Sequence, residues 1–382
     1  FTLLTHSVAT TTGARTLTEE IAGGTTGLAG RCLVISKSTL SDVNHDFEHE
    51  LKLVLISKLH RITRDRLAHA LKAAHVAADK DLNGITVDVF EHIILDRSQY
   101  EGEWCPETLV RILAARQERT LRSELRSDAG LHAEVAQLAS ACEVETERAP
   151  SGISERAVLL QKLEMYDDGG DLNTLQLPPA MGDVFKTPTS EHYVLLSPAC
   201  DLVVRRGGSR REVGDLAQFA ILALVEGTSK PSEKSNYYPL AHFDYCGKQW
   251  AKVQISKPVM VPLWLLDLVA LGIDGTCRIG STQWPESLLT RPWRDRAKFL
   301  FHHAELIIQG ARGGLSLAAL LRIPDGSIAE RWCRAQTEAD WTLELDLQRV
   351  ARVRERYAMA LHSTFALYAA RPALPVSLVR SK

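Results

Sequence analysis

The segment from Met181 to Gly208 constrains the fold more than any other part of the chain. Two short apolar runs, 183–186 and 192–197, flank a polar turn. This pattern predicts two β-strands that pair as a hairpin. The run from Tyr193 to Leu196 is apolar at every position, which is typical of a buried strand. The sequence therefore predicts a buried strand that ends at a polar corner.

That corner holds the strongest candidate site of the chain. Cys200 and Asp201 follow the strand, and a cluster of arginines comes next. A thiol beside positive charge has a lowered pKa and can act as a nucleophile or ligand. If the two strands pair, Asp183 approaches the same corner. The candidate ligand- or partner-binding residues are Asp183, Cys200, Asp201, Arg205, Arg206, Arg210 and Arg211.

Each of these residues also has a plain structural interpretation. Cys200 can pack in the core, while Asp201 caps a turn or pairs with an arginine. The arginine loop can be solvated, can dock on an acidic protein surface, or can grip a nucleic-acid backbone. Cys200 together with His242 and Cys246 would supply three of the four ligands of a tetrahedral zinc. This metal set is the weaker interpretation, and we expect no cofactor.

Composition limits the class of protein. Hydrophobic residues make up 45% and charged residues 24% of the chain, and the formal net charge is -2. This is an ordinary globular composition, without a global field that would favour nucleic acid or a membrane surface. Seven scattered cysteines indicate reduced thiols in a cytosolic protein. The apolar run 259–273 is too interrupted to cross a bilayer, and no signal peptide is visible. We expect a cytoplasmic protein that does not associate with membranes.

Hydrophobic periodicity divides the chain into three expected parts. Residues 1–40 contain short strands that fit a strand–helix–strand unit, 41–170 form a helical region, and 171–382 form a mixed α/β domain. The expected fold class is therefore α/β and α+β. Helices are predicted at 47–78, 87–95, 106–126, 131–147, 154–166, 214–226, 262–271, 294–309 and 345–370, and further strands at 251–256 and 276–279.

Three segments resemble the prokaryotic family of response receiver domain proteins. They are Glu48-His-Glu-Leu-Lys-Leu-Val-Leu-Ile-Ser-Lys-Leu-His-Arg61, Phe90-Glu-His-Ile-Ile-Leu-Asp-Arg-Ser98 with Glu101-Gly-Glu-Trp104, and Gly182-Asp183 with Cys200-Asp201-Leu202. The resemblance extends over most of the chain. Proteins of this family occur near GHKL-type ATPases in what look like phage-defence or conflict operons.

The resemblance implies a partial receiver at the start of the chain. A receiver has a Thr or Ser after its fourth strand and a Lys after its fifth, and Thr5 and Lys37 stand where these could fall. They are the receiver-like switch candidates. A phosphoacceptor Asp is not visible. Either it lay upstream of Phe1, in a part of the first domain that the sequence lacks, or this is a degenerate receiver that serves as a docking scaffold.

The resemblance and the lack of a standard catalytic signature together favour a non-enzymatic protein. We expect a regulatory or adaptor protein of a bacterial anti-phage defence or signalling system. It would bind a partner ATPase of the GHKL type and sense or relay a signal. Two alternatives stay open: a metal-dependent effector enzyme that acts on nucleic acid, and a nucleic-acid binding module. The sequence leaves the oligomeric state and the trigger open.

Overall fold

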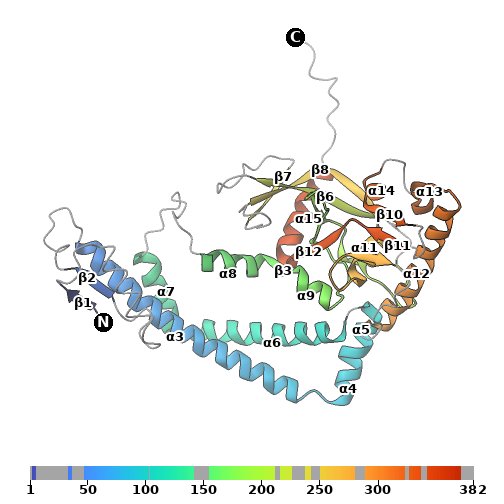
Figure 1. The fold of residues 1–382 in the computed structure, drawn as a ribbon. Coiled ribbons are helices and arrows are strands. Elements are labelled where there is room, and N and C mark those ends of the chain that lie inside the picture. The colour runs from blue at the N-terminus through green and yellow to red at the C-terminus, as the bar shows by residue number, and fades with distance from the viewer. Residues whose placement is uncertain are drawn as a thin grey trace, which may run out of the picture. The chain divides into compact units, whose positions relative to one another are not determined.

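The chain is a mixed α/β protein, as expected (Figure 1). The structure is a computed structural model that describes residues 2–5, 33–36, 47–102, 104–141, 155–210, 216–225, 237–241, 250–279, 289–322, 327–336 and 342–370. The chain folds into two compact units, 1–86 with 109–151, and 87–108 with 152–382. The three-part division 1–40, 41–170 and 171–382 stays a prediction.

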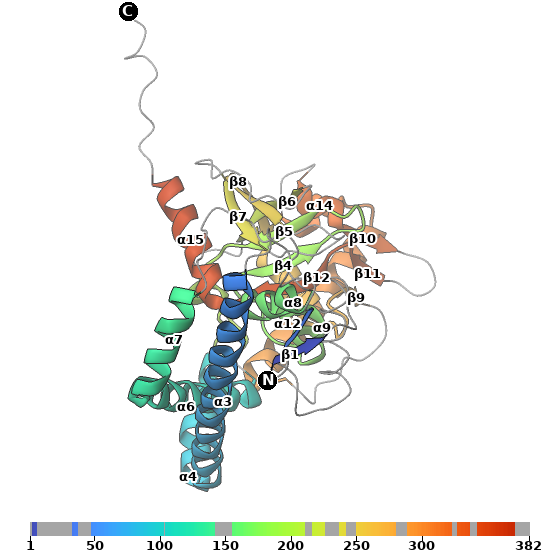
Figure 2. The same cartoon turned by 90° about the vertical axis from the view of Figure 1, so that its left-hand side faces the viewer.

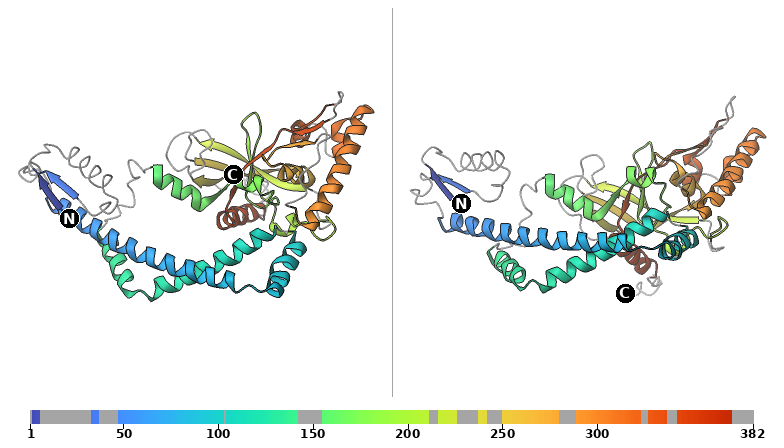
Figure 3. Two further views of the ribbon diagram at one scale, coloured as in Figure 1. Left: turned by 60° about the horizontal axis from the view of Figure 1, so that its bottom comes forward. Right: turned by 90° about the horizontal axis from the view of Figure 1, so that it is seen from below.

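The N-terminal unit combines a strand pair with long helices. Strands β1 (Thr2–Thr5) and β2 (Leu33–Ser36) pair in parallel, which is the pairing that a strand–helix–strand unit requires. The residues between them lie outside the described part of the chain. Helix α3 (Phe47–Asn83) is continuous (Figure 3). Helix α6 (Cys105–Ser127) enters this unit from the other one, and α7 (Ala129–Ala141) follows.

An arginine ties α3 to α7. Arg66 donates through Nη1 to Asp128 Oδ1 at 2.9 Å and forms an ion pair with Glu134, with Nε and Oε2 2.9 Å apart. Asp128 also accepts the backbone N–H of Leu131 at 2.9 Å, which is the role of a helix N-cap. These contacts join the start of α7 to α3.

The C-terminal unit is built around a seven-stranded sheet whose order is β3-β12-β4-β5-β6-β8-β7. Every neighbouring pair is antiparallel. The predicted hairpin is confirmed, because β4 and β5 pair with Val184 opposite Val194. The strands are β3 (Tyr166–Asp168), β4 (Asp183–Lys186), β5 (His192–Leu195), β6 (Leu216–Val225), β7 (Tyr237–Ala241), β8 (Trp250–Pro262) and β12 (Gln348–Val353).

A smaller sheet and, in the part of the chain that the structure describes, eleven helical segments besides the start of α6 complete this unit. The smaller sheet has the order β10-β11-β9, from β9 (Cys277–Ile279), β10 (Cys333–Gln336) and β11 (Thr342–Leu345). Apart from α6, the described helices are α4 (Val87–Val89), the π-helical η1 (Phe90–Leu95), α5 (Asp96–Glu101), α8 (Glu155–Met165), α9 (Gly169–Thr174), α10 (Ala199–Leu202), α11 (Leu263–Leu271), α12 (Arg291–Arg312), α13 (Leu317–Leu321), α14 (Ile328–Trp332) and α15 (Glu355–Ala369).

Side chains on the two faces of the large sheet enter two different cores. Phe185, Tyr193 and Phe219 pack with α11, α12 and the smaller sheet. The neighbouring residues Val184 and Val194 point to the other face and pack with α15. Figure 2 shows α15 and the smaller sheet on opposite sides of the large sheet. This alternation is the period of two that a β-strand imposes, and it explains why the strand predicted at 192–197 is apolar throughout.

Two predicted helices are wrong. The segment predicted as helix 214–226 is strand β6. It lies inside the sheet and has apolar side chains on both faces, so the period of two is hidden. The segment predicted as helix 345–370 starts with strand β12 and is helical only from Glu355 to Ala369. In β12 the buried positions are Arg349, Ala351 and Val353, and a buried arginine masks the alternation.

None of the helices that the structure describes combines the length and the hydropathy that a membrane crossing needs.

Candidate functional site

Asp183 lies in the interior rather than at a surface site. It is fully buried at the start of β4, and it accepts hydrogen bonds from Arg349 and Arg352 of β12. Its Oδ2 also accepts the backbone N–H of Ala180 at 3.0 Å. Its carboxylate therefore compensates two interior charges, and the binding role predicted for Asp183 stays a prediction.

Arg349 uses its whole guanidinium inside this cluster. Nε donates to Asn173 Oδ1 at 2.7 Å, Nη1 donates to the carbonyl of Leu177 at 2.8 Å, and Nη2 donates to the carbonyl of Leu172 at 3.1 Å. Burial lowers the pKa of Arg349 to about 10, and the nearby carboxylate of Asp183 opposes that shift. The cluster fastens the segment 172–178 to the large sheet.

Arg210 belongs to a second buried cluster. The carboxylate of Asp267, on α11, is fully buried and binds two arginines. Arg296 donates through Nε to Asp267 Oδ2 at 2.9 Å, and Arg210 donates to Asp267 and to the carbonyl of Leu202. Burial lowers the pKa of Arg210, while Asp267 raises it. Arg210 is thus committed to the interior and is not part of an open basic loop.

Cys200 and Asp201 lie at the surface on the short helix α10. Cys200 is exposed, and its thiol donates to Asp201 Oδ1 with Sγ and Oδ1 3.4 Å apart. The interpretation of Cys200 as a core thiol is therefore wrong. Of the other predicted residues, Arg211, His242, Cys246 and Lys37 lie outside the described residues, and Thr5 ends β1. Within the described ranges, no group of three His, Cys, Asp or Glu residues could hold a metal ion.

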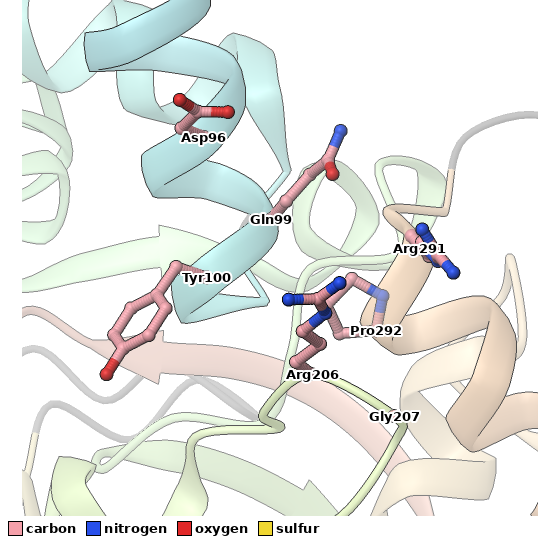
Figure 4. A pocket seen from close by; sticks show the side chains of 7 residues that line it. All are labelled: Asp96, Gln99, Tyr100, Arg206, Gly207, Arg291 and Pro292. Atoms are coloured by element: carbon pink, nitrogen blue, oxygen red, sulfur yellow. The ribbon is translucent and has the colours of Figure 1, made fainter.

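Arg206 lies at a surface pocket of about 320 Å³ in the C-terminal unit. Three elements line the pocket: α5 contributes Asp96, Gln99 and Tyr100, the loop after α10 contributes Arg206 and Gly207, and the start of α12 contributes Arg291 and Pro292. Figure 4 shows Arg206 on the loop after α10, beside Pro292, and Arg291 at the start of α12. The neighbouring Arg205 is exposed and does not line the pocket.

The two pocket arginines carry uncompensated charge. Both are exposed, and neither makes a hydrogen bond or ion pair within the part of the chain that the structure describes. The one carboxylate that lines the pocket, Asp96, faces His92, with Nδ1 and Oδ2 3.3 Å apart. The described lining therefore carries more positive than negative charge, and its cations are free to bind an anion.

Two glycines explain why the sequence places Arg206 beside Arg291. Gly208 has φ +75°, and a Cβ there would lie 2.5 Å from the backbone nitrogen of Arg296. Gly102 has φ +70°, and a Cβ there would lie 2.3 Å from the carbonyl oxygen of Val204. Only glycine allows these backbone approaches without strain. The loop after α10 is therefore seated directly on α12 and on the end of α5.

The start of α12 adds to the positive charge of the pocket. Thr290 is the N-cap residue, but its side chain makes no capping hydrogen bond, and its Oγ1 lies 3.5 Å from the carbonyl oxygen of Gly102. The first turn of α12 has no acidic residue and begins with Arg291. The first N–H groups of a helix carry partial positive charge, so the helix and the arginines act in the same direction.

Sequence reasoning found Arg206 but missed Gln99, Tyr100 and Arg291. These residues lie far from Arg206 along the chain, and the start of α12 was predicted at residue 294 rather than at Arg291. A usable signal was present. Thr290 followed by Arg291 and Pro292 is a helix start with a cation where an acidic residue is normal, and Gly207-Gly208 marks a tight turn beside Arg206.

Against known proteins, the chain matches no protein-family model, no curated protein and no solved structure.

Proposed function

We propose that this chain is a regulatory or adaptor protein of a bacterial anti-phage defence or signalling system. It binds a partner ATPase, of the GHKL type that the resemblance implies, and it senses an anionic group at the pocket of Arg206 and Arg291. The observation that carries this proposal is the pair of exposed, unpaired arginines that separate elements bring to one pocket.

The contrast with the other arginines of this region supports a binding role. Arg210 and Arg296 are buried and share the carboxylate of Asp267. Arg206 and Arg291 have no such partner within the described residues. Arg291 begins α12, the helix that also carries Arg296, and the loop of Arg206 packs against this helix. Exposed guanidinium groups held on a rigid support are suited to recognise a carboxylate or a phosphate.

The position of the pocket supports a regulatory role. Three elements meet there, and an anion bound between the two arginines would hold α5, the loop after α10 and α12 together. A ligand that binds one arrangement better than another shifts the population toward it. Asp96 falls within a segment that carries the family resemblance, Gln99 and Tyr100 lie beside it, and Arg206 follows the 200–202 segment closely.

Co-purification tests the proposal. The natural full-length protein is co-expressed with the ATPase encoded beside it, and size-exclusion chromatography with mass detection follows both, with metal content measured on the same peak. We expect one complex peak. The double variant Arg206→Ala/Arg291→Ala should still fold and should lose the response of the complex to the anionic signal, whereas Arg205→Ala/Arg294→Ala should retain it.

Two outcomes would contradict this proposal. If the protein migrates alone when it is mixed with the ATPase at high concentration, the adaptor role is wrong. If the solitary peak carries a stoichiometric divalent metal, the metal-dependent enzyme becomes the better interpretation.

A further inference from the structure

We infer that the pocket of Arg206 and Arg291 is a phosphate site whose ligand is a small phosphate monoester of nucleotide size. The inference rests on the proposed function only in taking this pocket as the recognition site. It adds the chemical class of the ligand, which the proposal leaves as an anionic group.

The electrostatics at the start of α12 call for an anion. Helix α12 spans Arg291–Arg312, and its first turn begins with the pocket residue Arg291 and has no acidic residue. Cations at the positive end of a helix are unfavourable, and an anion placed there removes that cost. Helix N-termini with free N–H groups bind phosphate for this reason. Pro292 has no N–H and the N–H of Arg294 donates to the carbonyl of Thr290. The donors at this end are therefore the N–H groups of Arg291 and Trp293. The side chain of Thr290 makes no capping bond and does not occupy them.

The donors suit a phosphate better than a carboxylate. One arginine fork satisfies both oxygens of a carboxylate, whereas a phosphate monoester presents three oxygens that need donors on several sides. The pocket supplies guanidinium groups from two elements and the amide of Gln99 from a third. Gly207 also lines it, and a Cβ at this position would meet nothing within 4 Å. A ligand oxygen can therefore approach the backbone of this loop closely.

The size and rim of the pocket favour a small molecule. Its volume of about 320 Å³ lies at the lower end of the range for ligand pockets. Tyr100 is 78% exposed at the rim and offers an aromatic face on which a base can stack. Asp96 is a rim carboxylate that can accept a hydroxyl hydrogen bond. Its charge disfavours a long polyanion, so a monoester fits this rim better than a nucleic-acid strand.

Isothermal titration calorimetry on the purified full chain tests the inference, with adenosine 5′-monophosphate, inorganic phosphate, adenosine and acetate as probes at equal ionic strength. We expect saturable binding of the monophosphate and of inorganic phosphate, and none of adenosine or acetate at the same concentrations. Arg206→Ala and Arg291→Ala should each weaken the binding of the monophosphate about tenfold or more, since a hydrogen bond to a charged group has this magnitude.

Matched controls separate direct contact from general charge. Arg205→Ala and Arg294→Ala each remove an exposed cation next to a pocket arginine, but neither residue lines the pocket. We expect either variant to change the affinity for the monophosphate by less than about twofold, because salt screens a cation that does not touch the ligand. All four variants should keep the melting temperature of the parent, because these side chains are exposed.

Three results would overturn the inference: no saturable binding of either phosphate compound at millimolar concentration, acetate binding as tightly as phosphate, or an equal loss in the control and pocket variants. The first of these would leave the adaptor role standing if the chain still co-elutes with the ATPase. Conversely, phosphate binding by a chain that does not co-elute with the ATPase would refute the adaptor role and leave the phosphate site intact.

Discussion

Replacing Asp183 by alanine is expected to destabilise the C-terminal unit by about 3–5 kcal/mol, the cost of leaving a buried charge without its partner. The carboxylate of Asp183 and the guanidinium of Arg349 are both fully buried, and the side chain of Arg352 is 16% exposed. Alanine removes the carboxylate that compensates these two cations. The backbone N–H of Ala180 loses its acceptor as well.

The remaining contacts limit the loss to this range. Arg349 keeps its hydrogen bonds to Asn173, Leu172 and Leu177, so the segment 172–178 is not released completely. The expected loss is nevertheless large, because the total free energy of unfolding of a domain is about 5–15 kcal/mol. The variant should therefore fold with a clearly lower urea midpoint rather than fail to fold.

Urea unfolding followed by tryptophan fluorescence measures this loss. Trp293 and Trp332 are 3% and 4% exposed in the core of this unit, so their emission reports its unfolding. Arg354→Ala is the matched control, because it breaks an exposed ion pair with Asp167 at 2.8 Å and should cost less than about 1 kcal/mol. If Asp183→Ala costs no more than this control, the buried cluster does not stabilise the fold as we argue.

Three further predictions follow from the described residues. The backbone N–H of Leu131, and to a lesser extent the guanidinium of Arg66, hold the pKa of Asp128 below its usual value. Its contribution to stability is therefore complete above the unfolded pKa of about 3.9 and is lost as the pH falls through the lower folded pKa. In the Asp128→Asn variant, the stability of the N-terminal unit should therefore fall less steeply as the pH drops from 5 to 2, measured by helical circular dichroism. A pH profile unchanged from that of the parent would refute this. Burial raises the pKa of Cys333 to about 12, so a maleimide should label the exposed Cys200 in the native protein but not Cys333; peptide mass spectrometry that finds equal labelling would contradict it. Gly207 and Gly208 both have positive φ, but a Cβ meets backbone only at Gly208. Gly207→Ala should therefore cost about 1 kcal/mol and Gly208→Ala clearly more in the same urea assay, and equal costs would show that the loop is not seated on α12.

The hairpin of β4 and β5 could be predicted from the sequence because its signal is local. Two apolar runs and a polar turn specify both the strands and their antiparallel pairing, and the register places Phe185 opposite Tyr193. Most of the predicted helices are likewise present, including the segment 262–271, which is α11 (Leu263–Leu271). In these elements the periodicity of the chain and its environment agree.

Strands β6 and β12 could not be recognised because tertiary burial changes the pattern. In β6, Ala217 and Phe219 enter one core while Ala220 and Leu222 enter the other, so the strand is apolar on both faces and looks like a buried helix. In β12 the position that should be apolar is Arg349. An arginine can be buried there only because Asp183 and several carbonyl groups accept its hydrogen bonds. These partners cannot be identified from the sequence around Arg349.

The same reasoning explains how far the candidate site could be predicted. The sequence presents Arg205, Arg206 and Arg210 as equivalent members of one basic loop. The structure separates them by partners and neighbours that are remote in sequence. Arg210 reaches Asp267, 57 residues away, and Arg206 lines one pocket together with Arg291, whereas Arg205 does not line it. Charge clustering in a sequence thus identifies a region where cations are concentrated, but only three-dimensional pairing shows which of them are neutralised. The free energy available for binding an anion lies in the arginines that the fold leaves uncompensated. Variants of Arg206 and Arg291 should therefore change the affinity for the anion, whereas a variant of Arg210 should change the stability of the fold.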